Sequence, residues 1–427
     1  GWKMSRLEKY SSYRESGVEW LGEIPEHWET LSNKNIFKIK QKLVGTKSSE
    51  YDLLSLTLRG IIKRDMENPQ GKFPAEFNTY QEVKKGDFVF CLFDVEETPR
   101  TVGLSQHDGM ITGAYTVMTT KSIDKDYLYY FYLNLDSSKR FKPLYRGLRN
   151  TIPKDSFFSF KTFIPPKEEQ TQIASFLDEK TSQINKAISQ KEKLIELLKE
   201  YRQITINEAV TRGLDKDVEL KDSGVEWIGE IPKHWEIEKG KRLFKQMKRP
   251  VREQDEIVTC FRDGEVTLRS NRRTDGFTNA LKEHGYQGVR KGDLIIHNMD
   301  AFAGAIGISD SDGKSTPVYS VCRPWDESIV YSKYYALYLR NLALQDFILS
   351  LAKGIRERST DFRFKDFGEL EYPLPPKEEQ IKIVEYIETQ TTKIDKAIEL
   401  QQNYIAKLKE YKASLIDSVV TGKVRVV

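Results

Sequence analysis

Apolar positions in two stretches of the chain recur at alternating steps of four and three residues, with charged residues between them. One stretch follows Pro165-Pro166 and runs to Gly213, and the other follows Pro375-Pro376 and runs to Gly422, with no glycine or proline inside either. Proline suits the first turn of a helix, and this spacing is the heptad pattern of a coiled coil. We predict two helices of about 45 residues, each about 65 Å long. Their seam residues are Ile184, Ile188, Ile195 and Leu198 in the first helix, and Ile394, Ile398, Ile405 and Leu408 in the second.

The stretches before the two helices contain shorter apolar segments, which predict strands and short helices. The apolar runs Asp87–Phe93 and Asp293–Met299 each follow a Lys-Gly turn and predict short buried strands. Tyr127–Leu135 and Tyr334–Leu342 carry aromatic residues at helical spacing, which we interpret as core helices rather than stacking platforms. The two bodies are therefore expected to be mixed α/β with one common topology.

Two short blocks occur twice. Ser16–Glu29 reads SGVEWLGEIPEHWE and returns at Ser223–Glu236 as SGVEWIGEIPKHWE, and the helix starts Ile164–Gln170 and Leu374–Gln380 share PPKEEQ. A period this long indicates a duplication of domains rather than a solenoid. Since one heptad helix cannot bury its stripe alone, the two copies predict an antiparallel pair that acts as a stiff spacer.

These patterns predict an α+β fold. Two mixed α/β domains are separated by a pair of long antiparallel coiled-coil helices, with a pseudo-two-fold internal repeat. The expected boundaries are 9–163 for the first domain, 164–213 for the first spacer helix, 214–373 for the second domain and 374–422 for the second spacer helix.

Composition narrows the class of protein. The chain has 427 residues, is 38% hydrophobic and 31% charged, and carries a net charge of +4, which permits a polyanionic partner without requiring one. No apolar run approaches the roughly 18 residues of a membrane span, and no signal peptide is expected. Cys91, Cys260 and Cys322 are far apart with no Cys-x-x-Cys spacing. We expect a reducing, cytoplasmic location with no disulfide and no structural zinc.

Catalytic motifs are absent from the sequence. There is no phosphate-binding loop, no HExxH, no GxSxG and no Asn/Asp-Pro-Pro-Tyr/Phe. Glu219 and Lys221 form a Glu-x-Lys element like that of some nucleases, but they lie in a polar linker after Gly213. We therefore expect no catalytic residues, no metal and no cofactor on this chain.

Residues suited to reading DNA are easier to find. Arginine binds guanine edges or phosphates, and asparagine has the amide geometry for adenine. The matched segments Gly147–Asn150 (GLRN) and Gly354–Glu357 (GIRE) each place an arginine after a glycine, although an arginine paired with a nearby carboxylate is an equal alternative. The candidates are Arg100, Arg146, Arg149 and Asn150 in the first body, and Arg272, Arg273, Asn298, Arg356 and Arg358 in the second.

The repeated tryptophan blocks and helix starts, with two divergent bodies between them, resemble the specificity subunit of type I restriction–modification enzymes. The resemblance covers the chain from about Lys9 onward. It implies that each body is a target recognition domain for one half of a bipartite DNA site and that the helices set the gap. It also implies two modification subunits, which bind S-adenosylmethionine and methylate adenine N6, and restriction motor subunits in the full complex. The chain itself would perform no chemistry.

The same resemblance implies that the modification subunits dock on the repeated blocks. The tryptophans of these blocks are large apolar anchors, for which simple core packing is the alternative. The interface candidates are Trp20, Trp28, Pro165, Gln170, Trp227, Trp235, Pro375 and Gln380.

Two other functions remain open from the sequence. The chain could be a nuclease or methyltransferase in its own right, which requires a cofactor or metal site that the sequence does not reveal. It could also be a protein-interaction scaffold that binds no nucleic acid, in which case it should show no salt-dependent DNA binding.

Overall fold

The computed structural model describes residues 8–65, 77–98, 100–272, 284–351 and 361–426. The chain divides into two compact units: unit 1 is Gly1–Lys191 with Gln402–Val427, and unit 2 is Glu192–Gln401. The division passes through both long helices, α4 (Lys167–Arg212) and α9 (Lys377–Val420). Each unit therefore holds one globular part and a half of each helix. The four boundaries read from the sequence stay a prediction.

The globular part of unit 1 is built on a four-stranded antiparallel sheet in the order β4-β11-β8-β9. Its central strand β8 (Phe88–Phe90) is buried at every position, as the continuous apolar run predicts. The other strands of this sheet are β4 (Phe37–Ile39), β11 (Thr116–Thr120) and β9 (Val102–Leu104). The described residues of the unit also form four two-stranded antiparallel sheets: β1 (Tyr13–Glu15) with β2 (Glu23–Pro25), β3 (Glu29–Ser32) with β12 (Lys161–Ile164), β5 (Leu54–Thr57) with β6 (Gly60–Lys63), and β7 (Gln81–Val83) with β10 (Gly109–Ile111).

Unit 2 repeats this topology sheet for sheet. Its four-stranded sheet has the order β16-β23-β20-β21, formed by β16 (Phe244–Gln246), β23 (Tyr319–Pro324), β20 (Leu294–His297) and β21 (Ile306–Ile308). The two-stranded sheets are β13 (Leu220–Asp222) with β14 (Glu230–Pro232), β15 (Glu236–Lys239) with β24 (Glu371–Leu374), β17 (Val258–Cys260) with β18 (Val266–Leu268), and β19 (Gln287–Val289) with β22 (Gly313–Ser315). The expected common topology is confirmed.

Three short helices recur at matched places in the two units. Unit 1 has α1 (Asn33–Ile36), α2 (Lys125–Ser137) and α3 (Lys154–Ser159), with 3-10 turns at Gly45–Glu50 and Lys142–Leu144. Unit 2 has α5 (Gly240–Leu243), α6 (Ser332–Leu344), α7 (Phe347–Ser350) and α8 (Phe364–Glu369), with 3-10 turns at Arg269–Asn271 and Ala301–Ala303. The matched helices are α1 with α5, α2 with α6, and α3 with α8.

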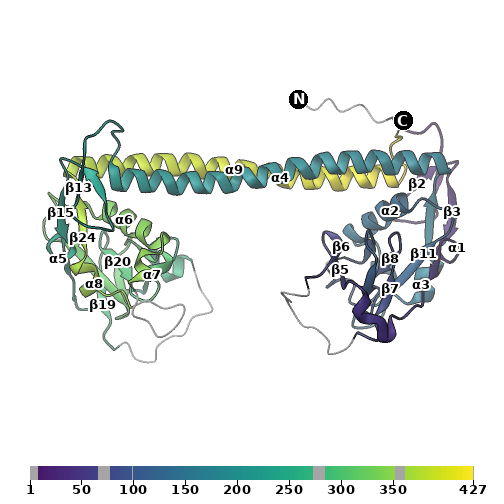
Figure 1. Cartoon of the computed structure of the whole chain (residues 1–427), viewed down its shortest axis with the longest axis horizontal. Helices are drawn as coiled ribbons and strands as arrows, with labels where there is room; N and C mark the ends of the chain where they lie inside the picture. The colour runs from purple at the N-terminus through teal and green to yellow at the C-terminus, as the bar shows by residue number, and fades with distance from the viewer. Residues whose placement is uncertain (1–7, 66–76, 99, 273–283, 352–360, 427) are drawn as a thin grey trace. The chain divides into compact units, whose positions relative to one another are not determined.

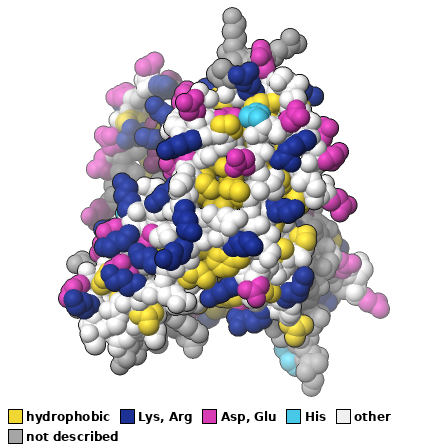
Figure 2. All heavy atoms as spheres, turned by 90° about the vertical axis from the view of Figure 1, so that its right-hand side faces the viewer, with side chains coloured by type: hydrophobic (Ala, Val, Ile, Leu, Met, Phe, Trp, Pro, Cys, Tyr) yellow, Lys and Arg dark blue, Asp and Glu magenta, His cyan; other side chains and the backbone are white. Residues whose placement is uncertain are grey.

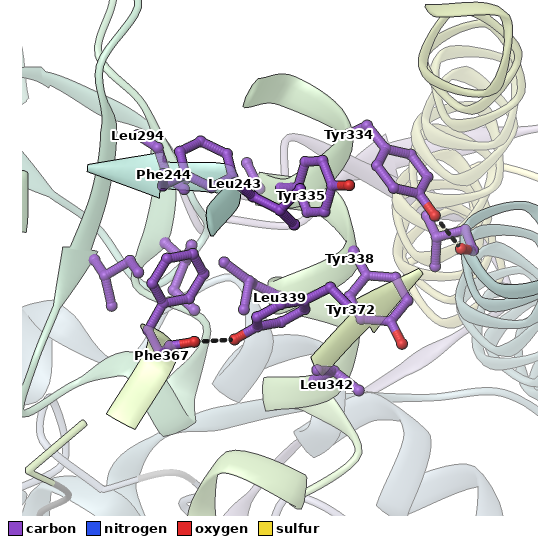
Figure 3. Packing of buried hydrophobic residues seen from close by; sticks show 14 of the residues in the cluster. Leu243, Phe244, Leu294, Tyr334, Tyr335, Tyr338, Leu339, Leu342, Phe367 and Tyr372 are labelled. Atoms are coloured by element: carbon purple, nitrogen blue, oxygen red, sulfur yellow. Dashed lines mark hydrogen bonds between the residues drawn. The ribbon is translucent and has the colours of Figure 1, made fainter. Parts of the chain in front are cut away.

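The aromatic helices α2 and α6 lie at the centre of each unit's core. In unit 2, Tyr334, Tyr335 and Tyr338 of α6 are almost fully buried, and Figure 3 shows them between the sheet and the long helices. Tyr334 Oη donates a hydrogen bond of 2.7 Å to the carbonyl of Val210 on α4. These aromatics therefore form the core that joins the sheet to the helix pair, and they provide no exposed stacking platform.

The two long helices run side by side and antiparallel (Figure 1). In unit 1, Lys412 Nζ donates to Asn185 Oδ1 at 2.9 Å. In unit 2, Arg202 lies 3.3 Å from the carboxylate of Asp395. Later residues of α4 therefore contact earlier residues of α9, as expected for antiparallel helices. The helices have 46 and 44 residues, close to the predicted length.

The structure buries most of the expected seam. Ile184, Ile188, Ile195, Ile394 and Ile405 are buried, and Leu198, Ile398 and Leu408 are partly exposed. Among the described residues, no helix is long and apolar enough to cross a membrane. The three cysteines are buried and unpaired.

Candidate nucleic-acid interface

The two repeated blocks of the first copy meet at one carboxylate. Glu169, in the first turn of α4, accepts hydrogen bonds from Trp28 Nε1 at 3.0 Å and from the hydroxyl of Tyr10, and it contacts His27 Nε2 at 2.8 Å. Trp28 is only 1% exposed. A carboxylate is also favoured by the helix dipole at this position. These four residues, which we call the Glu169 cluster, hold the repeated tryptophan block Ser16–Glu29 against the start of α4.

Unit 2 contains the same arrangement. Glu379 accepts a hydrogen bond from Trp235 Nε1 at 3.1 Å and contacts His234 Nε2 at 2.8 Å. Trp235, His234 and Glu379 form the Glu379 cluster. The histidines therefore pair with a carboxylate beside a tryptophan. Among the described residues, no group of three or more histidine, cysteine, aspartate or glutamate side chains could hold a metal.

The glutamine that ends each PPKEEQ block is buried, and both its amide oxygen and its amide nitrogen make hydrogen bonds. Gln170 Nε2 donates to the carbonyl of Pro165 at 2.8 Å, and its Oε1 accepts from the backbone N–H of Asp124, the N-cap of α2, at 2.8 Å. Gln380 makes the same two bonds, to Pro375 and from Tyr331, each at 2.8 Å. Each glutamine therefore ties the start of a long helix to the start of the aromatic helix.

Each long helix ends in the unit opposite to the one where it starts. Gly422, which ends α9, has φ +72° and lies against Pro25 and Trp28 of unit 1. Gly213, which ends α4, has φ +77° and lies against Trp235 of unit 2. A β-carbon at Gly422 would lie 2.3 Å from a ring carbon of Pro25, so the space admits glycine alone.

The partly exposed tryptophans lie at a second junction, where the aromatic helix meets the end of the opposite long helix. In unit 1, Asp417 of α9 accepts from Arg140 at 2.6 Å, Asn134 at 3.1 Å and Lys423 at 2.7 Å. The Arg140 guanidinium lies 4.8 Å from the ring centre of Trp20. Burial tends to raise the pKa of Asp417, but the hydrogen bonds from Lys423, Arg140 and Asn134 outweigh it and lower that pKa below its ordinary value.

The matched junction in unit 2 is neutral. Asn207 Oδ1 of α4 accepts from Asn341 Nδ2 and Gln345 Nε2, each at 2.9 Å. Trp227 stacks on Phe347, with ring centres 4.5 Å apart. The same backbone site is thus filled by an ion pair in one copy and by amides with an aromatic stack in the other.

Replacing Asp417 with asparagine should reduce the free energy of unfolding by about 1–2 kcal/mol at pH 7, because a partly buried Arg140 loses its counter-charge. Since the folded-state pKa of Asp417 is lowered, the stabilisation exists above the ordinary aspartate pKa of about 4 and disappears as pH falls through the lowered value. The wild-type minus Asp417→Asn difference, measured by urea unfolding, should therefore shrink below about pH 4. The double variant Arg140→Phe/Asp417→Asn, which copies unit 2, should recover part of the loss. A pH-independent difference would contradict this assignment.

Most residues predicted to contact the modification subunits make contacts within their own unit. Trp28, Trp235, Gln170 and Gln380 are buried inside their own units, whereas Trp20 and Trp227 keep partly exposed surfaces. Pro165 and Pro375 supply carbonyl oxygens to the buried glutamines. Contact of any of these residues with another subunit stays a prediction.

Three candidate DNA-reading residues of unit 1, Arg146, Arg149 and Asn150, lie in one tight turn. Arg149 donates two hydrogen bonds to Asp94, at 3.1 and 2.5 Å, and remains 74% exposed. Asn150 donates weakly to Glu96 at 3.4 Å. Arg146 donates to main-chain carbonyls at 3.2 and 2.7 Å. The alternative of an arginine paired with a carboxylate thus describes Arg149, but its guanidinium still faces solvent.

Arg100 lies in a different setting. It approaches Asp136 at 3.6 Å and donates to Ser137 at 3.2 Å. It lines a cavity of about 530 Å³ between α2 and the two long helices, together with Lys409 and Lys412. Burial lowers the pKa of Lys412, and the nearby charge of Arg100 lowers it further.

The candidate DNA-reading residues of unit 2 lie in different settings. Arg272 donates to Asp263 at 2.7 Å and Glu265 at 2.8 Å and lies 4.2 Å from the ring centre of Phe261. Asn298 is buried, and its Oδ1 accepts from Ser320 at 2.9 Å. The side chain of Asn298 is therefore not exposed for contact in this structure, and its contact with DNA stays a prediction. Arg273, Arg356 and Arg358 lie outside the described residues.

On the face of unit 1 drawn in Figure 2, positive charge is spread rather than gathered in one stripe. Figure 2 shows the face of unit 1 with Lys and Arg side chains across most of its width, hydrophobic side chains between them, and Asp and Glu mainly toward the margins. Such a surface can attract a polyanion, but it does not by itself fix the path of one.

The chain is similar to specificity subunits of type I restriction enzymes. A family model described as the type I restriction modification DNA specificity domain matches residues 108–197. The chain is 26% identical over 332 residues to the type I restriction enzyme MjaVIII specificity subunit of Methanocaldococcus jannaschii, covering 74% of this chain and 75% of that protein. It is 25% identical over 281 residues to the EcoBI specificity subunit of Escherichia coli, covering 61% and 57%.

Solved structures share the fold. A chain from a study of complex assembly and conformational transition of the type I R-M system matches with a TM-score of 0.66 at 12% identity, covering 93% of this chain and 98% of that one. The HsdS subunit from Thermoanaerobacter tengcongensis matches with a TM-score of 0.53 at 14% identity, covering 96% and 100%.

Proposed function

We infer that this chain is a specificity subunit of a type I restriction–modification system, and that its two units read the two halves of a bipartite DNA target. The observation that carries this proposal is the repetition of one five-sheet scaffold with different side chains on it. Two domains with the same backbone fold and different surface side chains are suited to binding two different DNA sequences. The target is therefore asymmetric.

The described arginines of the two units lie at unmatched positions and in different settings, which supports unequal half-sites. The loop of unit 1 presents Arg146 and Arg149 to solvent, whereas Arg272 of unit 2 is held by two carboxylates and an aromatic ring. Phosphate contacts from such cations position the duplex, and a few side chains in each unit specify bases. The paired helices set the gap between the halves.

The partners follow from the same assignment. Two modification subunits would dock on the helix starts and junctions, bind S-adenosylmethionine and methylate adenine N6, and restriction subunits would join the full complex. We propose that this chain performs no chemistry. Incubation of the isolated chain with labelled S-adenosylmethionine, or with Mg²⁺ and DNA, should give no turnover, and any turnover in either reaction would contradict this proposal.

Sequence-specific methylation by the complete assembly tests the function. With its modification subunits, the chain should direct methylation to one asymmetric bipartite motif, measured by methylome sequencing of cells that express the assembly. Binding of that assembly to DNA should weaken steeply as salt rises, because neutralised phosphates release counter-ions. Methylation without any motif, or DNA binding that is insensitive to salt, would contradict the assignment.

A further inference from the structure

The turn Gly147–Asn150 presents a leucine to solvent at its tip. Leu148 is fully exposed, at 104% of its reference area. The turn is closed by Arg146 and Thr151, which exchange two main-chain hydrogen bonds of 2.8 and 3.0 Å. Because single exposed leucines are common on protein surfaces, exposure alone assigns no role to this side chain.

The backbone beneath Leu148 is held in place by a second turn. The carbonyl of Arg149 accepts from the N–H of Asp94 at 2.9 Å, and the carbonyl of Asn150 accepts from the N–H of Val95 at 3.4 Å. The Arg149–Asp94 ion pair adds two side-chain bonds. A side chain on a preordered backbone loses little conformational entropy when it binds. The loop therefore holds an apolar group ready for contact.

Two arginines, Arg146 and Arg149, flank Leu148 in the sequence of the turn. Arg149 is largely exposed despite its pairing with Asp94. The described part of the chain shows Arg146 bonded only to main-chain carbonyls, so its charge is available to an anion. Proteins that distort DNA use this combination, with an apolar side chain inserted between base steps and arginine or lysine beside it.

We propose that Leu148 is a wedge that inserts into the half-site read by unit 1 and fills the space left by the adenine that a modification subunit flips out. This proposal rests on the proposed function, because a methyltransferase must take its target base out of the stack. The sequence of the second copy has the same order, Gly354-Ile355-Arg356, in a segment outside the described residues.

The test compares Leu148→Ser with Leu148→Met in the complete assembly, by single-turnover methylation of a duplex that carries the mapped motif. Leu148→Ser should slow methylation of one target adenine by about 10- to 100-fold, since unstacking costs a few kcal/mol per step. The adenine of the other half-site should keep its rate and serves as the internal control. Leu148→Met retains an apolar wedge and should stay within about threefold of the wild type.

A mismatch opposite the affected adenine separates a wedge from an ordinary contact. A mismatched base is less costly to unstack, so it should restore most of the rate lost in Leu148→Ser. Fluorescence of 2-aminopurine at the target position should rise in the wild-type assembly and rise less in Leu148→Ser.

Three outcomes would overturn the wedge. These are equal slowing at both adenines, no rescue by the mismatch, and loss of a modification subunit from Leu148→Ser with unchanged 2-aminopurine fluorescence. The last would make Leu148 a protein contact. Failure of the wild-type assembly to methylate any defined motif would instead refute the proposed function, so the two failures are distinguishable.

Discussion

Inserting one heptad into both long helices should lengthen the preferred gap between the half-sites by about three base pairs and leave the half-site sequences unchanged. Seven residues add about 10 Å to a helix, and B-DNA rises about 34 Å in 10 base pairs. Because Arg202 faces Asp395, insertions after Leu198 and after Ile398 lie at about the same level of the antiparallel pair. A whole heptad keeps the seam on the same side of each helix. Methylome sequencing of cells expressing the variant assembly would give the new gap directly.

The control is the same insertion in one helix only. It shifts the antiparallel register, so Arg202 can no longer meet Asp395 and the seam residues no longer face one another. This variant should lose stability and motif-specific methylation together. An unchanged gap in the double insertion, with motif-specific methylation retained, would refute the role of the helices as a spacer.

Replacing Glu169 with alanine should reduce the free energy of unfolding by about 2–4 kcal/mol. The change removes the charged acceptor shared by Tyr10, His27 and Trp28. Hydrogen bonds to a charged group contribute about 1.5–3 kcal/mol each, and the indole N–H of Trp28 would remain buried without a partner. Glu169→Gln keeps one acceptor oxygen and should lose less. Urea unfolding at pH 7 measures both variants.

Glu168 provides the matched control. It carries the same charge in the same first turn of α4, but its side chain is exposed. Glu168→Ala should therefore change the stability by no more than about 0.5 kcal/mol. An equal loss in the two alanine variants would show that helix-dipole charge, rather than the Glu169 cluster, accounts for the effect.

Several features of the fold were predictable because their signals are local. Heptad spacing and the glycines that end it define two long helices, and Gly213 and Gly422 do take positive φ. The run at Asp87–Phe93 predicts a strand, although the strand itself is the shorter Phe88–Phe90. The site was less predictable. Glu169 and Glu379 stand in the PPKEEQ blocks, and the histidines and tryptophans stand in the other repeated block, but no sequence signal pairs the two blocks.

Periodicity and repeated blocks, which can be read directly from the order of the residues, were enough to predict the two long helices and the duplicated bodies, and they carried the resemblance to a family. Only the tertiary structure decided which residues meet. Glu169 lies 142 positions from His27, and Arg140 lies 277 positions from Asp417. No periodicity encodes contacts over such separations, because they form only when packing brings the end of one long helix against the unit in which the other begins. The same packing buries Asn298 and leaves Leu148 exposed.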